Sequence, residues 1–124
     1  MTSWPIGIST GCFYQWDIME CLETIRASGF SLIEVVFSPA HLNYKDPAAV
    51  QRAALKIQAL GMEAYSFHAP FASDIDISST DLDCREYSLD EILIAVDAAA
   101  ALGVHYFVIH PGPENAEHPS REEP

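Results

Sequence analysis

Apolar residues along the chain follow two alternating spacings, which predict strands and helices in turn. Short apolar runs indicate strands over residues 5–10, 30–37, 62–67 and 104–109. Between these runs, apolar residues recur at the i, i+3, i+4 and i+7 spacing of a buried helix face. The predicted order is β-α-β-α-β-α-β, with a loop over residues 11–16. Such an order favours an α/β fold with parallel strands and right-handed crossovers.

The predicted helices begin at capping acids. Asp17 precedes the first helix, Asp46 precedes a proline at the first turn of the second, and the third starts near Asp81 and ends at Leu102. The apolar spacing predicts the buried positions, which are Ile18, Cys21, Leu22 and Ile25 in the first helix, Val50, Ala53, Ala54, Ile57 and Leu60 in the second, and Leu89, Ile92, Leu93, Val96 and Ala100 in the third.

The last three strands each follow a helix-ending glycine, Gly29, Gly61 or Gly103, which indicates a repeated βα unit. The fourth and sixth residues after each glycine are large and should pack on the helices: Ile33, Val35, Tyr65, Phe67, Phe107 and Ile109. The polar residues fall on the opposite face: Glu34, Ser66, His68 and His110. One polar and one apolar face favour a barrel with outer helices over a sheet covered on both sides.

Two histidines occupy matching places in this repeat. His68 follows Gly61 by seven residues, and His110 follows Gly103 by the same number. Ligand chemistry in α/β proteins gathers at the carboxyl ends of the strands, so the pair predicts a shared site. Imidazole can serve there as a metal ligand or a general base. The alternative is that each ring only hydrogen-bonds a loop backbone.

Glu34 is the one acid in an apolar strand, and an unpaired carboxylate is costly to bury. We expect Glu34 to face a polar cavity, bind a ligand or pair with a base; a strand-end acid facing water is the alternative. Phe13 and Trp16 follow the first strand and are candidates for lining a pocket, although packing within the loop would also explain these aromatic residues. His41, His105 and His118 are weaker candidates.

Charge and composition argue against some classes of function. The net charge of -12 argues against binding to nucleic-acid phosphates, because such binding needs clustered Lys and Arg. No apolar stretch is long enough for a membrane span. Three widely spaced cysteines indicate reduced thiols and a cytoplasmic protein. We expect one domain over residues 1–112 and a loop or disordered tail over residues 113–124.

Four segments form a recognisable set: Phe67-His-Ala-Pro-Phe71, Arg85-Glu-Tyr-Ser88, Ala101-Leu-Gly-Val104 and Val108-Ile-His-Pro-Gly112. Together they resemble the xylose-isomerase-like TIM-barrel superfamily, which contains sugar isomerases and epimerases and the apurinic-site endonucleases. Residues 29–34 are similar to the second strand of that group. The resemblance extends from about Ile6 to Gly112 and implies the first half of a TIM barrel, with four strands and three helices.

The resemblance also implies a function: metal-assisted isomerisation or epimerisation of a sugar or polyol, once a second half completes the barrel. It implies a divalent metal (Zn, Mn or Mg) on His68 and His110, and substrate binding by Glu34 and His68; it assigns no catalytic residue. Phe13 and Trp16 join the substrate-binding candidates through their place after the first strand. The exposed strand edges predict a homo-oligomer in which two copies close one barrel. Alternatives are a fragment of a longer enzyme, a non-catalytic half-barrel dimer that binds metal or a small polar ligand, and an abasic-site endonuclease relative, which the acidic charge disfavours.

Overall fold

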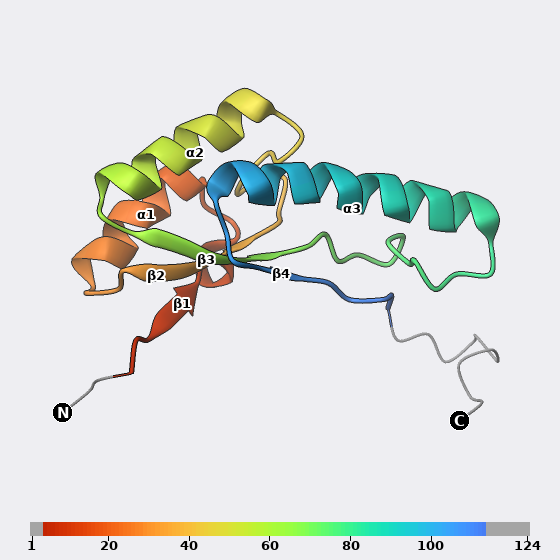
Figure 1. Ribbon diagram of the computed structural model, residues 1–124, viewed down its shortest axis with the longest axis horizontal. Helices are drawn as coiled ribbons and strands as arrows, with labels where there is room; N and C mark the ends of the chain where they lie inside the picture. Colours follow the sequence, from red (N-terminus) through yellow and green to blue (C-terminus); the bar gives the residue numbers. More distant parts are fainter. Residues whose placement is uncertain (1–3, 114–124) are drawn as a thin grey trace.

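The computed structural model describes residues 4–113 as a four-stranded parallel sheet with its helices on one side (Figure 1). The elements are β1 (Gly7–Ser9), a 3₁₀ helix η1 (Thr10–Phe13), α1 (Ile18–Ala27), β2 (Leu32–Val36), α2 (Pro47–Ala59), β3 (Glu63–His68), α3 (Leu82–Leu102) and β4 (Tyr106–Val108). The strand order is β1-β2-β3-β4, and every neighbouring pair is parallel. The predicted α/β half-barrel is confirmed. The predicted tail lies outside the described residues, except for Pro113.

The helices begin at the acids that the sequence indicates. Side-chain oxygens of Asp17, Asp46 and Asp81 accept hydrogen bonds from backbone N–H groups in the first turns of α1, α2 and α3. Left-handed glycines follow the helices, with φ of +96° at Gly29 and +73° at Gly103. Glycine adopts this conformation without the steric cost of a Cβ, so each helix can stop and turn into the next strand.

The core lies between the helices and one face of the sheet. The four positions predicted for α1 are all buried, as are Val50, Ala53 and Ile57 of α2. The prediction for α3 is wrong, because Ile92 is the only one of its five predicted positions that is buried. Two neighbouring faces of α3 are apolar, and the alanine-rich one packs on the core, where small side chains allow close approach: Ala95, Ala98 and Ala99.

An irregularity in β3 changes which residues face the helices. Ile33 of β2 pairs with Ala64, whereas Glu34 pairs with Ser66, so Tyr65 is an extra residue in β3. Ala64 is buried in place of Tyr65, whose side chain is 44% exposed, contrary to the prediction. Ile109 is also exposed, because it lies past the paired part of β4. Phe107 packs on the core as expected, stacked on Phe67 with ring centroids 5.9 Å apart.

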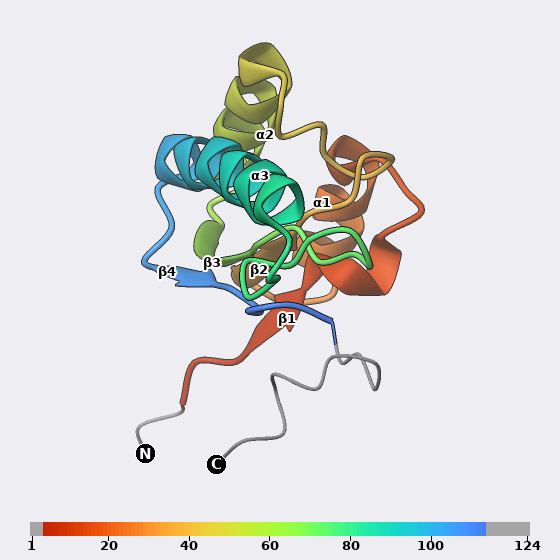
Figure 2. The same cartoon turned by 90° about the vertical axis from the view of Figure 1, so that its right-hand side faces the viewer.

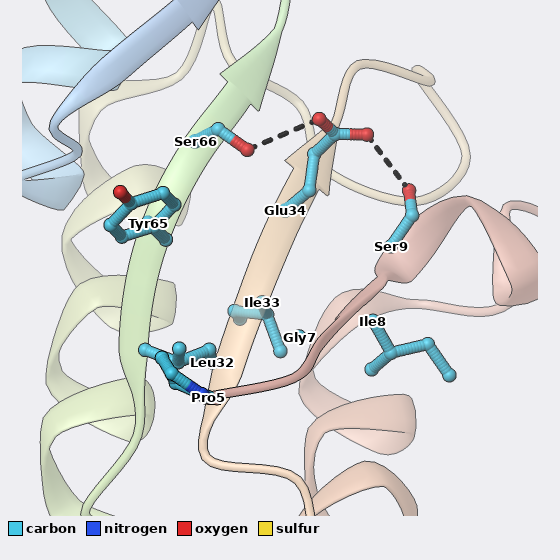
Figure 3. A pocket seen from close by; sticks show the side chains of 9 residues that line it. All are labelled: Pro5, Gly7, Ile8, Ser9, Leu32, Ile33, Glu34, Tyr65 and Ser66. Atoms are coloured by element: carbon cyan, nitrogen blue, oxygen red, sulfur yellow. Dashed lines mark hydrogen bonds between the residues drawn. The ribbon is translucent and has the colours of Figure 1, made fainter. Parts of the chain in front are cut away.

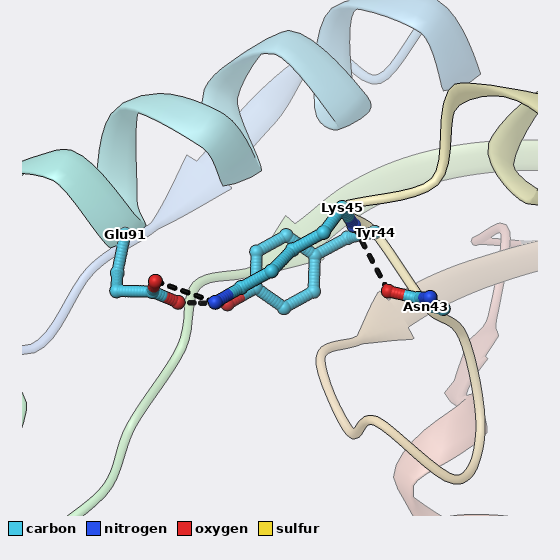
Figure 4. A network of polar contacts seen from close by, with 4 residues as sticks. All are labelled: Asn43, Tyr44, Lys45 and Glu91. Atoms are coloured by element: carbon cyan, nitrogen blue, oxygen red, sulfur yellow. Dashed lines mark hydrogen bonds and ion pairs between the residues drawn. The ribbon is translucent and has the colours of Figure 1, made fainter.

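A closed polar cluster, formed by Tyr44, Lys45 and Glu91, ties the segment before α2 to α3 (Figure 4). The Tyr44 hydroxyl donates to Glu91 Oε2 at 2.5 Å, and Lys45 Nζ donates to Oε1 at 2.6 Å. Burial alone would raise the pKa of Glu91, but the hydrogen bonds from Lys45 and Tyr44 outweigh it and lower that pKa. Burial, together with the bond to Glu91, raises the pKa of Tyr44.

The remaining segments differ in detail from the sequence prediction. Residues 11–13, predicted as loop, belong to η1, which Ser9 caps by accepting from the Gly11 N–H. The first, second and fourth strands are shorter than the apolar runs that predict them. Among residues 4–113, no helix has the length and apolar character that crossing a bilayer requires.

Candidate functional site

Glu34 is held at the centre of the polar face of the sheet. Ser9 of β1 donates to its Oε1 at 3.1 Å, and Ser66 of β3 donates to its Oε2 at 3.1 Å (Figure 3). Three neighbouring strands therefore place these side chains side by side, as the alternation of strand residues predicts. The carboxylate lines a cavity of about 420 Å³ that extends along β1 and β2 to Tyr65.

His68 and His110 meet at the carboxyl ends of β3 and β4. Their Nε2 atoms are 3.0 Å apart, and Nδ1 of His68 lies 2.9 Å from the Ala69 carbonyl oxygen. A carbonyl can only accept, so Nδ1 of His68 carries a proton and, in the neutral ring, its Nε2 holds a lone pair. Nε2–H of His110 then donates to that lone pair. The Phe71 ring packs on His110, with centroids 4.5 Å apart.

This geometry suits a metal ligand at His68. Metal-binding histidines usually donate their second ring nitrogen to a carbonyl or carboxylate, as Nδ1 of His68 does. Two nitrogens on one tetrahedral zinc ion would be about 3.3 Å apart, close to the separation observed here. No cluster of three or more His, Cys, Asp or Glu side chains within residues 4–113 is arranged to hold a metal ion. The described residues thus fit two ligands of such an ion.

Phe13 and Trp16 lie apart from the cavity that Glu34 lines, and neither borders it. Their rings pack on each other with centroids 5.6 Å apart; Phe13 contacts the core, and Trp16 is half exposed. The Trp16 carbonyl accepts from Nδ1 of the buried His41 at 2.6 Å.

The weaker histidine candidates lie away from the pair or outside the described residues. His105 pairs with Glu63 at 2.5 Å, and both side chains are more than half exposed. Glu63 begins β3, so this contact lies at the opposite end of the strand from His68. His118 lies beyond the part of the chain that the structure describes.

Sequence reasoning missed Phe71 as a neighbour of His110 and missed the closed polar cluster. Phe71 follows β3 in a loop whose course no periodic pattern indicates. Tyr44 and Glu91 are 47 positions apart, and neither belongs to a local motif. The pairing of Ser66 with Glu34, in contrast, follows from strand alternation.

Comparison with known proteins agrees with this architecture. The model of the xylose isomerase-like TIM barrel family matches residues 22–123. Among curated proteins, no sequence matches the chain closely enough to indicate a relative. Similar solved structures include D-psicose 3-epimerase from Clostridium cellulolyticum H10, crystallised with D-tagatose (17% identity, TM-score 0.65, 82% of this chain and 35% of that chain).

Two further structures cover more of the sequence. The TTHB071 protein from Thermus thermophilus, soaked with ZnCl2, is 25% identical over 94% of this chain and 42% of that chain, with a TM-score of 0.67. The 3-keto-D-glucoside 4-epimerase YcjR from E. coli is 18% identical over 98% of this chain and 44% of that chain, with a TM-score of 0.70. The chain thus spans less than half the length of these neighbours. By its fold and by the extent of the family match, it belongs to the xylose isomerase-like TIM barrel family.

Proposed function

We propose that this chain supplies one half of a metal-assisted site that isomerises or epimerises a sugar or polyol, and that a second half completes it. The observation that carries the proposal is the convergence of His68 and His110, whose Nε2 atoms lie 3.0 Å apart at the strand ends. The sugar epimerases among the structural neighbours support the substrate class.

In the proposed site, His68 and His110 hold a divalent ion (Zn, Mn or Mg) through their Nε2 atoms. Such an ion acts as a Lewis acid toward a substrate oxygen. Glu34 accepts a hydrogen bond from a sugar hydroxyl, because a carboxylate has acceptor capacity beyond its two serine donors. His68 also contacts the substrate. Phe13 and Trp16 do not border the Glu34 cavity, so in this proposal they contact a sugar ring outside it, through the half-exposed Trp16.

The second half of the barrel supplies the remaining metal ligands and the acid–base groups. Closure by a second copy is the expectation from the sequence, and the free edges of β1 and β4 support it, since unpaired strands readily add a neighbour. The net charge of -12 supports a small polar substrate over nucleic acid.

A non-catalytic half-barrel dimer that binds a metal or a small polar ligand is the second candidate. The self-contained pairing of Glu34 with Ser9 and Ser66 favours it, because both carboxylate oxygens already have partners within the chain. An abasic-site endonuclease relative is disfavoured by the acidic charge.

We further propose that the protein works in the cytoplasm. The free cysteines Cys12, Cys21 and Cys84 support this placement, because unpaired thiols persist in reducing compartments. Burial, followed by the nearby charge of Asp17, raises the pKa of the Cys21 thiol to about 11, which keeps that residue protonated at neutral pH.

Titration of the purified chain with Co²⁺ or Zn²⁺ tests the metal site. We expect one ion per His68–His110 pair. The affinity for that ion should fall at least tenfold in His68→Ala and in His110→Ala. His105→Ala is the matched control, because this ring pairs with Glu63 at the other end of β3 and should leave affinity unchanged. Equal affinity in all three variants would place any metal elsewhere and overturn the assignment.

A further inference from the structure

His110 lies past the end of regular strand pairing. The ladder between β3 and β4 ends at the pair of His68 and Val108, and β4 is an edge strand in the part of the chain that the structure describes. The sheet alone therefore does little to fix the direction of the exposed His110 ring. A metal-binding side chain stays in place only when packing and hydrogen bonds around it hold it there.

The loop between β3 and α3, residues 69–81, holds the backbone around this histidine. The Ala69 N–H donates to the Val108 carbonyl at 2.8 Å, on the near side of the ring. The Ser78 N–H donates to the Pro111 carbonyl at 3.2 Å, on the far side. In Figure 2 the green loop lies between α3 and the blue segment that follows β4, and Figure 1 shows the same arrangement.

The same loop also contacts both histidine rings. The Phe71 ring packs on the ring of His110, with centroids 4.5 Å apart. The Ala69 carbonyl accepts from Nδ1 of His68 at 2.9 Å, while the N–H of the same residue is bonded to β4. The loop therefore sets the position of one histidine relative to the other.

Ser88 anchors this loop to α3. The residue is fully buried, and a buried hydroxyl is normally hydrogen-bonded. Its Oγ accepts from the Asp76 N–H at 2.7 Å and donates to the Cys84 carbonyl at 2.7 Å. The hydroxyl thus acts as donor and as acceptor at once, and it fixes the middle of the loop to one place on the helix.

Asp76 connects this anchor to the segment that carries His110. Its Oδ1 accepts from the Ser78 N–H at 2.9 Å and from the Ser78 hydroxyl at 2.7 Å, which forms a tight turn. The Ser78 N–H is shared between this oxygen and the Pro111 carbonyl. A continuous series of hydrogen bonds therefore extends from Ser88, through the turn, to the residue after His110.

We propose that the β3–α3 loop, anchored at Ser88, positions His110 so that its Nε2 and that of His68 can share one metal ion. Ser88 and Phe71 are positioning residues, because both act through His110 and not on the ion. The inference rests on the proposed metal site and identifies what holds its second ligand. Loss of a group that orients a metal ligand typically lowers metal affinity by roughly 10–100-fold.

The first test uses the metal-free full chain in mildly alkaline buffer, where imidazole is neutral. Nitrogen-15 NMR of the rings reports which nitrogen carries the proton. In the parent we expect the proton on Nδ1 of His68 and on Nε2 of His110. In Ser88→Ala and in Phe71→Ala, His110 should mix its two tautomers. His68 should keep its own, because the Ala69 carbonyl still accepts from it.

The second test measures Co²⁺ affinity in the same variants. Ser88→Ala should lower the affinity about tenfold, and Phe71→Ala by a smaller factor. Ser79→Ala is the matched control, because this serine is buried in the same loop but its Oγ accepts from the Asp81 N–H, outside the series of bonds. The control should keep the parent affinity and the parent tautomer of His110. Urea unfolding shows whether the two serine variants lose similar stability.

Two results would overturn the proposal. One is a folded Ser88→Ala, or a Phe71→Ala, in which the His110 tautomer or the Co²⁺ affinity stays at the parent value; Phe71 is half exposed, so the fold should not depend on it. The other is an equal change in Ser79→Ala, because general loosening of the loop would then explain both. A parent chain that binds no Co²⁺ would instead overturn the metal site, while the tautomers would still decide whether the loop positions His110.

Discussion

Two polar clusters of this half-barrel use their side chains in opposite ways. In the closed polar cluster, both oxygens of Glu91 have donors from Tyr44 and Lys45, and little of the carboxylate reaches solvent. The histidine pair lies at the strand ends, where His110 is exposed. Among the described residues, the Nε2 lone pair of His68 accepts a hydrogen bond from His110 alone. A cluster whose acceptors all have partners within the chain holds elements of the fold together. A cluster with a lone pair open to coordination can bind a metal ion or a ligand.

The largest effect should come from breaking the closed polar cluster. Glu91→Ala leaves the buried Tyr44 hydroxyl without its acceptor, so we expect a loss of about 1–3 kcal/mol in unfolding free energy. Urea denaturation measures it. Glu23→Ala is the control, because Glu23 forms an exposed ion pair with Lys56, and such pairs contribute little to stability. Equal losses would show that the closed cluster is no more structural than a surface pair.

Acid should weaken the same cluster in a defined direction. The folded pKa of Glu91 lies below its ordinary value of 4.5, so its contribution is present above that value and is lost as pH falls through the folded pKa. Stability measured against pH should therefore fall less steeply on the acid side in Glu91→Gln than in the parent. If the unfolding free energy of Glu91→Gln falls as steeply at acid pH as that of the parent, the Glu91 carboxylate does not stabilise the fold as proposed.

A smaller loss is expected on the polar face of the sheet. Ser66→Ala removes one of the two hydroxyl donors to Glu34 and should lower the unfolding free energy by about 0.5–1.5 kcal/mol. The exposed Ser31, just before β2, provides the control, and Ser31→Ala should stay near the parent value. If the two serine variants have the same unfolding free energy, the hydrogen bond from Ser66 to Glu34 contributes little to stability.

The smallest effect on stability should come from the histidine pair itself. His110→Ala removes an exposed ring, so we expect a change within about 0.5 kcal/mol in the metal-free protein. Thermal unfolding in the presence of a chelator measures it. A loss of unfolding free energy as large as that of Glu91→Ala would show that the histidine pair stabilises the fold, and the two clusters would then not differ in role.

The parts of the fold that follow local rules could be predicted from the sequence. Asp46 before a proline marks the start of α2, and seven-residue spacing from glycine places His68 and His110 together. The orientation of α3 could not be predicted, because two of its faces are apolar and the spacing of apolar residues alone does not decide between the alanine-rich face and the leucine-rich one. Tyr65 was misplaced because one inserted residue in β3 shifts the alternation, and no local pattern signals such a shift.

The strand order β1-β2-β3-β4 means that each described strand pairs only with its neighbours in the sequence. Architectures with this property resemble linear arrays, in which stability is a sum over units and the contacts between adjacent ones. The end units have one neighbour each and should open before the centre, so amide exchange would advance inward from β1 and β4. Because pairing is sequential, whole βα units can be added or removed at the ends of such a chain without changing how the remaining strands pair. Half a barrel can therefore keep the strand pairing of a whole one.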